Sequence, residues 1–123
     1  MKMAFDESKP IFLQIKEQLE DSILNDTLKS GERVPSTNEF ATFYKINPAT
    51  AGKGINELVQ EDILLKRRGV GMFVTENAKE LIMKKRKKAF YDDYLLPLQN
   101  EAKKLRISKD ELIKLIERGE KDI

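Results

Sequence analysis

The chain has no cysteine, no histidine and no tryptophan among its 123 residues. Without cysteine it cannot form disulfide bonds or thiolate metal sites, and without histidine it lacks the most common general base and metal ligand. A phosphate-binding loop of the form Gly-x-x-x-x-Gly-Lys is also missing. We therefore expect no catalytic residues, no metal ion and no cofactor, and we do not expect an enzyme.

Long apolar runs are missing as well. No stretch approaches the roughly 18 to 20 apolar residues that span a bilayer, and the first residues lack the apolar segment of a secretory signal. Hydrophobic residues make up 40% of the chain and charged residues 36%, which suits one helical domain or a small domain with an appendage. We expect a cytoplasmic protein with no membrane partner.

The formal net charge of +2 is unevenly distributed. Residues 1–78 carry 10 cations and 12 anions, whereas residues 79–123 carry 13 cations and 9 anions. Any affinity of the first part for nucleic acid must come from local clusters, chiefly Lys66 to Arg68 together with Lys53. The run Lys84 to Lys88 is a further cluster, which fits a solvated helix surface better than a DNA contact.

Two helix start signals lie close together, after a first helix expected over residues 10–25. Ser36-Thr37-Asn38-Glu39 has the Ser-x-x-Glu form of a capping box, and Asn47-Pro48 places a capping residue before a proline at the first helical position. The short link between these two helices predicts a helix-turn-helix, whose second helix enters the major groove of DNA by its N-terminal end. The helix after Ser36 should bury its apolar side chains, Phe40, Ala41, Phe43 and Tyr44.

A helical projection separates two faces of the second helix of this pair. The face expected to be buried carries Ala51, Ile55, Leu58 and Val59. The opposite face carries Ala49, Thr50, Lys53 and Glu57. Its N-terminal residues are candidate groove readers, of which Thr50 and Lys53 rank highest, whereas Asn47 fits a cap better than a base reader.

Two glycines inside this helix, Gly52 and Gly54, each cost about 1 kcal/mol relative to alanine. Close packing would explain Gly54. Gly52 fits either a close approach to DNA or a tight helix crossing, and the sequence does not separate these.

Residues Leu64 to Val74 predict a β-hairpin with a basic tip. Lys66, Arg67 and Arg68 precede Gly69-Val70-Gly71, and glycine allows the backbone to take a positive φ and to approach a surface closely. Alone, such a hairpin is as often a solvated turn. Its position directly after a helix-turn-helix indicates a wing, whose cations suit phosphate oxygens or a minor groove.

From Glu76 the pattern predicts a long helix, kinked or broken at Pro97, and a last helix that starts at the Ser108 capping box and ends at Gly119. This tail is too short for a core of its own, so its apolar face needs a second copy of the chain as cover. The expected dimerisation residues are Leu81, Phe90, Tyr94, Leu95, Leu98, Leu105, Leu112 and Ile116. Phe90, Tyr91 and Tyr94 could instead line an effector pocket, and any such pocket should lie at the dimer interface or between the tail and the wing domain.

The expected fold is mainly α with a small β-wing. A winged helix-turn-helix DNA-binding domain over residues 1–77 precedes a two-helix dimerisation region over residues 78–123.

Four segments in this order resemble the DNA-binding domain of GntR-family bacterial transcription regulators. They are Pro10-Ile11-Phe12-Leu13-Gln14-Ile15, Gly31-Glu32-Arg33-Val34-Pro35-Ser36, Glu39-Phe40-Ala41 and Arg68-Gly69-Val70-Gly71-Met72-Phe73-Val74. The short tail and Asn47-Pro48-x-Thr50 look like the YtrA-type subgroup. The resemblance implies a dimeric regulator, frequently a repressor of transporter operons, without a large effector domain.

The sequence departs from this family at three positions that commonly hold arginine, where it has Asn38, Pro48 and Gly52. Three expected DNA contacts are therefore missing, although the Asn38 amide can still bind phosphate or adenine. We expect an operator unlike that of arginine-rich relatives. The DNA-binding residues expected are Ser36, Thr37, Asn38, Asn47, Ala49, Thr50, Lys53, Lys66, Arg67, Arg68, Gly69, Val70 and Gly71.

The leading hypothesis is a homodimeric regulator, a repressor in its simplest form, that binds a two-fold-related operator in double-stranded DNA. A small-molecule effector stays unknown. The alternative is a winged helix that binds a protein and not DNA, an interpretation that the net charge of −2 over residues 1–78 favours.

Overall fold

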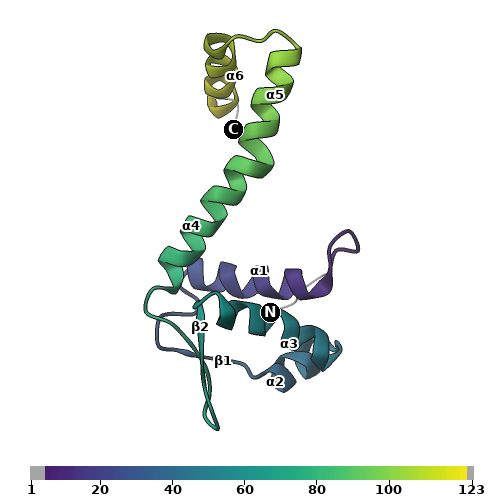
Figure 1. The fold of residues 1–123 in the computed structure, drawn as a ribbon, viewed down its shortest axis with the longest axis vertical. Helices are drawn as coiled ribbons and strands as arrows, with labels where there is room; N and C mark the ends of the chain where they lie inside the picture. Colours follow the sequence, from purple (N-terminus) through teal and green to yellow (C-terminus); the bar gives the residue numbers. More distant parts are fainter. Residues whose placement is uncertain (1–4, 122–123) are drawn as a thin grey trace. The chain divides into compact units, whose positions relative to one another are not determined.

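The structure, a computed structural model, describes residues 5–121. It divides into two compact units, residues 1–84 and residues 85–123 (Figure 1). In its described residues the first unit has three complete helices, a small sheet and the first half of a fourth helix, and the second unit is helical. The expected fold class, mainly helical with a small β-wing, is confirmed.

The three helices of the first unit are α1 (Ile11–Leu24), α2 (Thr37–Tyr44) and α3 (Pro48–Gln60). Both predicted start signals are confirmed. The Ser36 hydroxyl accepts the N–H of Glu39, while the Glu39 carboxylate accepts the N–H of Ser36, which completes a capping box. The Asn47 side chain accepts the N–H of Ala49 and caps α3.

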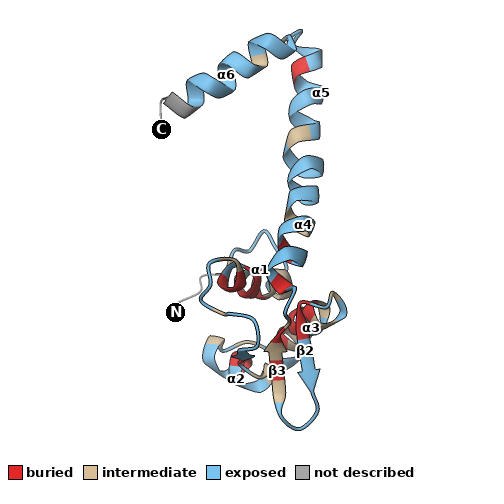
Figure 2. Ribbon diagram, turned by 90° about the vertical axis from the view of Figure 1, so that its left-hand side faces the viewer, coloured by how far each residue is buried: buried red, intermediate tan, exposed pale blue. Residues whose placement is uncertain are grey.

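The predicted hairpin consists of β2 (Leu64–Arg67) and β3 (Gly71–Val74), paired antiparallel with Leu64 opposite Val74 and Arg67 opposite Gly71. A third strand, β1 (Arg33–Val34), adds to the free side of β3, so the sheet order is β1-β3-β2. The extended conformation that Pro35 imposes on the preceding residues suits this pairing. The hairpin projects beyond the three helices in both ribbon views (Figures 1 and 2).

The core lies where the three helices meet the inner face of the sheet (Figure 2). Ala51, Ile55 and Leu58 of α3 are fully buried, as the projection predicted. The prediction for α2 is wrong at one residue, because Phe43 is 63% exposed while Phe40 and Ala41 are buried. The further buried apolar residues of this unit are Ile15, Leu19, Ile23, Val34, Ile63, Leu64, Met72, Val74, Ala78 and Ile82.

Helices α1 and α3 cross closely at Gly54. A Cβ atom built there would lie 2.6 Å from the carbonyl oxygen of Phe12, closer than any side chain tolerates. Close packing therefore explains this glycine. The same helix pair is linked by Lys16, whose ammonium lies 3.1 Å from Glu57 and 2.9 Å from Glu61. Burial acts to lower the pKa of Lys16, but the hydrogen bonds to Glu61 and Glu57 outweigh it and raise the pKa.

After the wing, α4 (Ala78–Phe90) continues through a π-helical turn, η1 (Tyr91–Leu95), into α5 (Leu96–Lys104). Pro97 lacks an N–H and would clash with a carbonyl of the preceding turn, and the wide turn directly before it accommodates both effects. The disruption expected at Pro97 thus takes the form of a π turn.

The last helix is α6 (Lys109–Lys121), and the Ser108 hydroxyl accepts the N–H of Glu111 at its start, as the capping motif predicted. Its predicted end at Gly119 is wrong, because the helix continues to Lys121. Among the described residues no heavy atom lies within 4 Å of a Cβ built at Gly119, and the glycine keeps a helical conformation.

Ala78 and Ile82 are buried with the core of the first unit, so that core extends beyond residue 77, the predicted end of the winged-helix domain. The division of roles between residues 1–77 and 78–123 stays a prediction. Among residues 5–121, no helix is both long and apolar enough to cross a membrane.

Candidate nucleic-acid interface

The N-terminus of α2 presents the first group of predicted DNA-binding residues. Asn38 is exposed, and Ser36 and Thr37 are partly exposed. The Ser36 hydroxyl accepts the N–H of Glu39 in the capping box. The hydrogen bond from the Ser36 N–H, followed by that from the Ser36 side chain, lowers the pKa of the Glu39 carboxyl.

The first turn of α3 holds the second group. Asn47, Pro48 and Ala49 are exposed, and Thr50 is partly exposed. The Asn47 side-chain oxygen lies 2.8 Å from the Ala49 nitrogen and serves as a cap, in line with the prediction for Asn47. The first two residues of the helix therefore present a ring and a methyl group, which suit contact with a thymine methyl.

The outward face of α3 differs from the expected one at two positions. Glu57 is half-buried and paired with Lys16, so it belongs to the contact between α1 and α3 and was wrongly assigned to the open face. Asn56 is exposed and lies on the same side as Ala49 and Lys53. Asparagine binds adenine through two hydrogen bonds, so Asn56 is a candidate reader that our sequence reasoning missed. The same helical projection, carried one turn further, would have found it.

Lys53 is exposed, and its ammonium lies 4.0 Å from the centre of the Phe12 ring of α1. This cation–π contact holds the end of the side chain in one place. The charge is thus positioned at the edge of α3 beside α1, where it suits a phosphate oxygen better than a base edge at the centre of a groove.

Gly52 is not required by helix packing. A Cβ built there would lie 3.5 Å from Cγ2 of Thr37, an ordinary van der Waals contact. Of the two explanations for this glycine, the tight crossing is therefore removed and the close approach to DNA remains.

We predict that Gly52→Ala raises the free energy of unfolding by up to about 1 kcal/mol, because alanine favours the helix and its methyl group has room. Urea unfolding followed by circular dichroism measures the change. A loss of stability would show that the crossing of α2 and α3 does need glycine.

The tip of the wing is a tight turn closed by a hydrogen bond of 2.9 Å from the Val70 N–H to the Arg67 carbonyl. Gly69 has a φ of 78° and Gly71 a φ of 142°, conformations that other residues rarely adopt. Val70 is 61% exposed at the end of the hairpin. An apolar side chain at a basic tip suits contact with the sugar walls of a minor groove.

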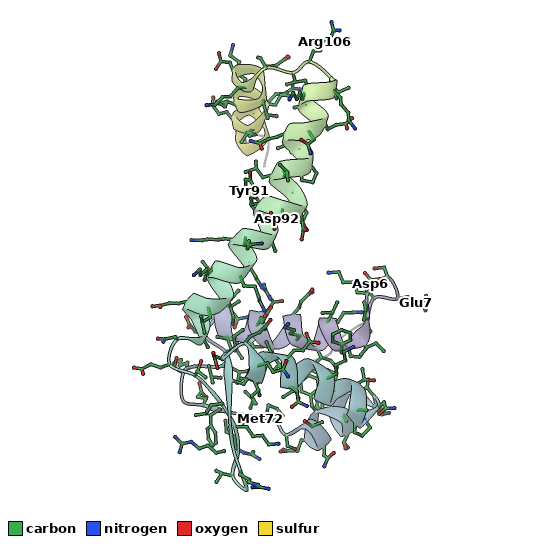
Figure 3. All side chains as sticks on the ribbon, in the orientation of Figure 1. Asp6, Glu7, Met72, Tyr91, Asp92 and Arg106 are labelled. Atoms are coloured by element: carbon green, nitrogen blue, oxygen red, sulfur yellow. The ribbon has the colours of Figure 1, made fainter. Side chains whose placement is uncertain are left out.

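The three wing cations do not form one cluster, because successive residues of a strand point to opposite faces. Lys66 lies opposite Met72, which is buried on the inner face (labelled in Figure 3), whereas Arg67 lies opposite Gly71 on the outer face. The Arg67 guanidinium lies 5.5 Å from the centre of the Phe73 ring. Arg68 is exposed in the turn, at the tip of the hairpin.

Arg33 is a further cation that our sequence reasoning missed. It extends from β1 with half of its side chain exposed, and its guanidinium lies 3.4 Å from the Glu39 carboxylate. Its Nε lies 2.7 Å from the position that a Cβ at Gly71 would take. Arg33 therefore connects the base of the wing to the start of α2. Strand alternation around the buried Val34 was the signal that could have placed it outward.

Most predicted dimerisation residues are exposed in the second unit. Phe90, Tyr94 and Leu98 are 61%, 68% and 42% exposed, and the rings of Phe90 and Tyr94 lie 5.7 Å apart. Leu105 and Ile116 are likewise exposed, and Leu95 and Leu112 are partly buried. Among the described residues of this unit, Ala102 is the buried apolar one, so the helices have little core between them. Such an apolar surface needs a cover.

Residues 12–74, just over half of the chain, match the family model described as bacterial regulatory proteins, gntR family. The chain belongs to the GntR family. In Bacillus subtilis (strain 168), the HTH-type transcriptional repressor YtrA is 38% identical over 76 residues, which cover 62% of this chain and 58% of that repressor. The uncharacterized HTH-type transcriptional regulator YhcF of the same strain is 32% identical over 113 residues, 92% of each chain.

Among solved structures, a GntR family transcriptional regulator from Listeria monocytogenes superposes with a TM-score of 0.76 at 29% identity, over 93% of this chain and 98% of that one. The resemblance to the GntR family and to its YtrA-type subgroup is thus confirmed, and so is the winged-helix architecture. This GntR-family chain is accordingly a transcriptional regulator with a DNA-binding winged helix.

The three departures from the arginine pattern of the family all lie on the surface where DNA contacts are expected. Asn38 and Pro48 are exposed at the starts of α2 and α3, and Gly52 is partly exposed one turn further along α3. None of the three is buried in the core. The departures therefore change the chemistry of this GntR-family surface without a compensating role in packing.

Proposed function

We propose that this protein is a repressor that binds, as a homodimer, a two-fold-related operator and blocks transcription by its presence there. Each subunit would place residues 48–53 of α3 in a major groove and residues 67–71 of the wing at the adjacent minor groove. The two half-sites would then lie about 34 Å apart, or a multiple of that distance. The dimer would thus set the spacing of the operator.

One observation carries the DNA-binding part of this proposal. One face of the N-terminal half of α3, with Pro48, Ala49 and Lys53, is exposed directly after the cap, and the same unit presents a projecting hairpin with cations and a glycine tip. Three of the ten cations in residues 1–78 lie in that hairpin. Because the rest of the unit carries an excess of anions, DNA binding should depend on these few side chains.

The alternative, a winged helix that binds a protein partner, is supported by the acidic balance of residues 1–78 and by Leu65, which is 49% exposed on the outer face of the wing. Fluorescence anisotropy with a random-sequence duplex separates the two functions. Our proposal predicts binding at low salt that weakens steeply as salt rises. An absence of salt-sensitive binding would favour the protein partner.

We predict that Arg67→Ala together with Arg68→Ala weakens binding to all DNA sequences alike. The slope of log K against log salt should become shallower by about 0.9 for each phosphate that the protein no longer neutralises. Anisotropy titrations at several salt concentrations measure this slope. The matched control is Lys103→Ala with Lys104→Ala, which removes two exposed cations of α5. An unchanged slope in the wing variant would contradict contact between the wing and phosphate.

A further inference from the structure

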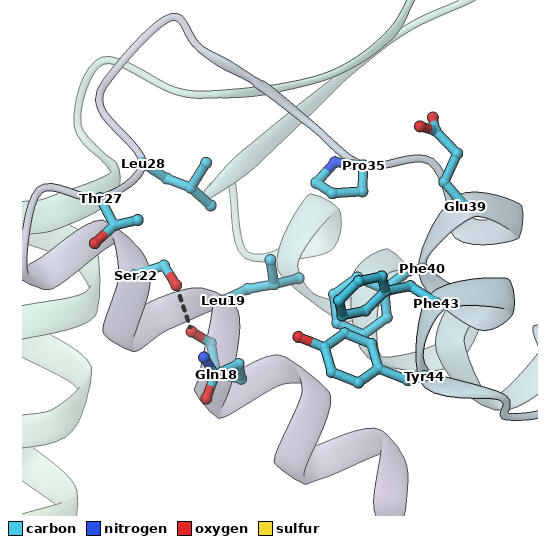
Figure 4. Close-up of a pocket in the computed structure, with 10 residues that line it drawn as sticks. All are labelled: Gln18, Leu19, Ser22, Thr27, Leu28, Pro35, Glu39, Phe40, Phe43 and Tyr44. Atoms are coloured by element: carbon cyan, nitrogen blue, oxygen red, sulfur yellow. Dashed lines mark hydrogen bonds between the residues drawn. The ribbon is translucent and has the colours of Figure 1, made fainter. Parts of the chain in front are cut away.

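A cavity of about 370 Å³ lies within the first unit, between α1, α2 and the loop that joins α1 to β1 (Figure 4). Leu19 lies on its α1 side, Leu28 lines it from the loop, and Pro35 lines it from the link between β1 and α2. Pockets that bind small molecules have volumes of about 300 to 1,000 Å³ and mostly apolar linings. This cavity has the size and the lining of a small-molecule pocket. None of the residues that line it is a predicted dimerisation residue of the tail.

The α2 side of the cavity is a wall of three aromatic rings. The ring centres of Phe40 and Tyr44 lie 4.7 Å apart, and those of Phe43 and Tyr44 lie 4.8 Å apart. The side chain of Phe43 is 63% exposed, so an apolar ring at the rim of the cavity is mostly accessible to solvent. The Tyr44 hydroxyl points from this wall toward α1 in Figure 4 and has no hydrogen-bond partner among residues 5–121.

The lining carries little charge that faces the cavity. Glu39 is its one carboxylate, and that group accepts the Ser36 N–H at 3.2 Å, lies 3.4 Å from Arg33 and points away from the rings (Figure 4). The Ser22 hydroxyl donates to the Gln18 carbonyl at 3.1 Å. A charged ligand would lose its hydration here without gaining a partner, so the cavity suits an uncharged one.

We propose that this cavity binds a small, uncharged aromatic molecule. The Tyr44 hydroxyl forms a hydrogen bond with a polar group on the ring of this ligand. The three rings of α2 offer edge-to-face and offset contacts to such a molecule. The ligand would bridge α1 to α2, the helix whose N-terminus carries Ser36, Thr37 and Asn38. An effect of this ligand on DNA binding rests on the proposed function, whereas the binding of the ligand to the cavity does not.

The test is a titration of the full-length, ¹⁵N-labelled protein with indole, a neutral aromatic probe with one N–H donor, in the absence of DNA. Saturable shifts of amide signals around Leu19, Leu28 and Phe40 are expected. Phe43→Ala, at a mostly exposed position that the core does not need, should weaken binding at least tenfold. Tyr44→Phe, which removes one hydrogen bond, should weaken it about threefold to tenfold.

A second variant, Leu28→Trp, fills the cavity and should abolish the shifts even if Phe43→Ala disturbs α2. The control Ile113→Ala removes a 41% exposed apolar side chain in the second unit and should leave indole binding unchanged. Shifts that grow linearly without saturation, or equal affinity in Phe43→Ala and the unchanged protein, would each overturn the proposal. Because no DNA is present, failure of the proposed function would not affect this result.

Discussion

Replacing Phe90, Tyr94 and Leu98 with serine should convert the protein to a monomer and weaken operator binding by about 10²-fold to 10⁴-fold. These side chains are 61%, 68% and 42% exposed, so the change removes apolar surface without opening a core. A dimer binds its second half-site as an intramolecular step, and a monomer loses that advantage although every contact within one half-site remains. Analytical ultracentrifugation measures the oligomeric state, and anisotropy with a selected duplex measures the affinity.

The matched control for this triple variant changes three exposed polar residues of the same helices, Lys87, Asn100 and Lys103, to serine. It should remain dimeric. Binding of the Phe90, Tyr94 and Leu98 variant to random DNA at low salt should fall much less than its binding to the selected operator, because each wing and α3 are intact. A dimer that persists in the triple variant would show that these residues do not form the subunit interface.

Gly54→Ala should lower the free energy of unfolding by about 3 kcal/mol, the upper end of the range for overpacked sites. The added Cβ would lie 2.6 Å from the Phe12 carbonyl oxygen, and a backbone atom cannot rotate away as the end of a side chain can. Helices α1 and α3 would have to separate at the centre of the core. Since a small domain is stable by only about 5 to 15 kcal/mol, this is a large fraction of the total.

Gly52→Ala is the matched control, since it makes the same change two residues away on the same helix, where the Cβ has room. Urea unfolding of the two variants should therefore give changes of opposite sign. Equal effects would mean that the helix crossing does not distinguish these positions and would contradict the packing account of Gly54.

The starts of the helices could be predicted from the sequence because they are decided locally. A cap at Ser36, Asn47 or Ser108 satisfies backbone N–H groups within three residues of itself, and the structure contains the corresponding hydrogen bonds. The wing was predictable for the same reason, since its tip requires the positive φ that Gly69 supplies. The end of α6 was not, because Gly119 keeps a helical conformation and does not take the positive φ with which a glycine ends a helix.

The side-chain positions that were wrong depend on residues distant in the sequence. Glu57 turned out half-buried because Lys16, on another helix, pairs with it. Phe43 was placed inward by its apolar character, but Phe40 and Tyr44, four residues apart, share the face that α2 turns to the core and leave Phe43 at the rim of a cavity. The three wing cations looked like one cluster in sequence, yet strand alternation divides them between two faces.

The candidate interface was predictable as a set of segments and less so as a set of side chains. The segments follow from the capped helix pair and the hairpin. Arg33 and Asn56 were missed because neither belongs to a cluster of charge or to a cap, and only the pairing of β1 with β3 and the exposed face of α3 bring them into view.

Selection of bound sequences from a pool of random duplexes with the full-length protein tests whether a homodimer binds a two-fold-related operator. We expect an enriched motif of two inverted half-sites whose centres lie about 34 Å apart or a multiple of that distance. A single asymmetric site would contradict the dimer, and a pool without any enrichment would contradict sequence-specific DNA binding itself.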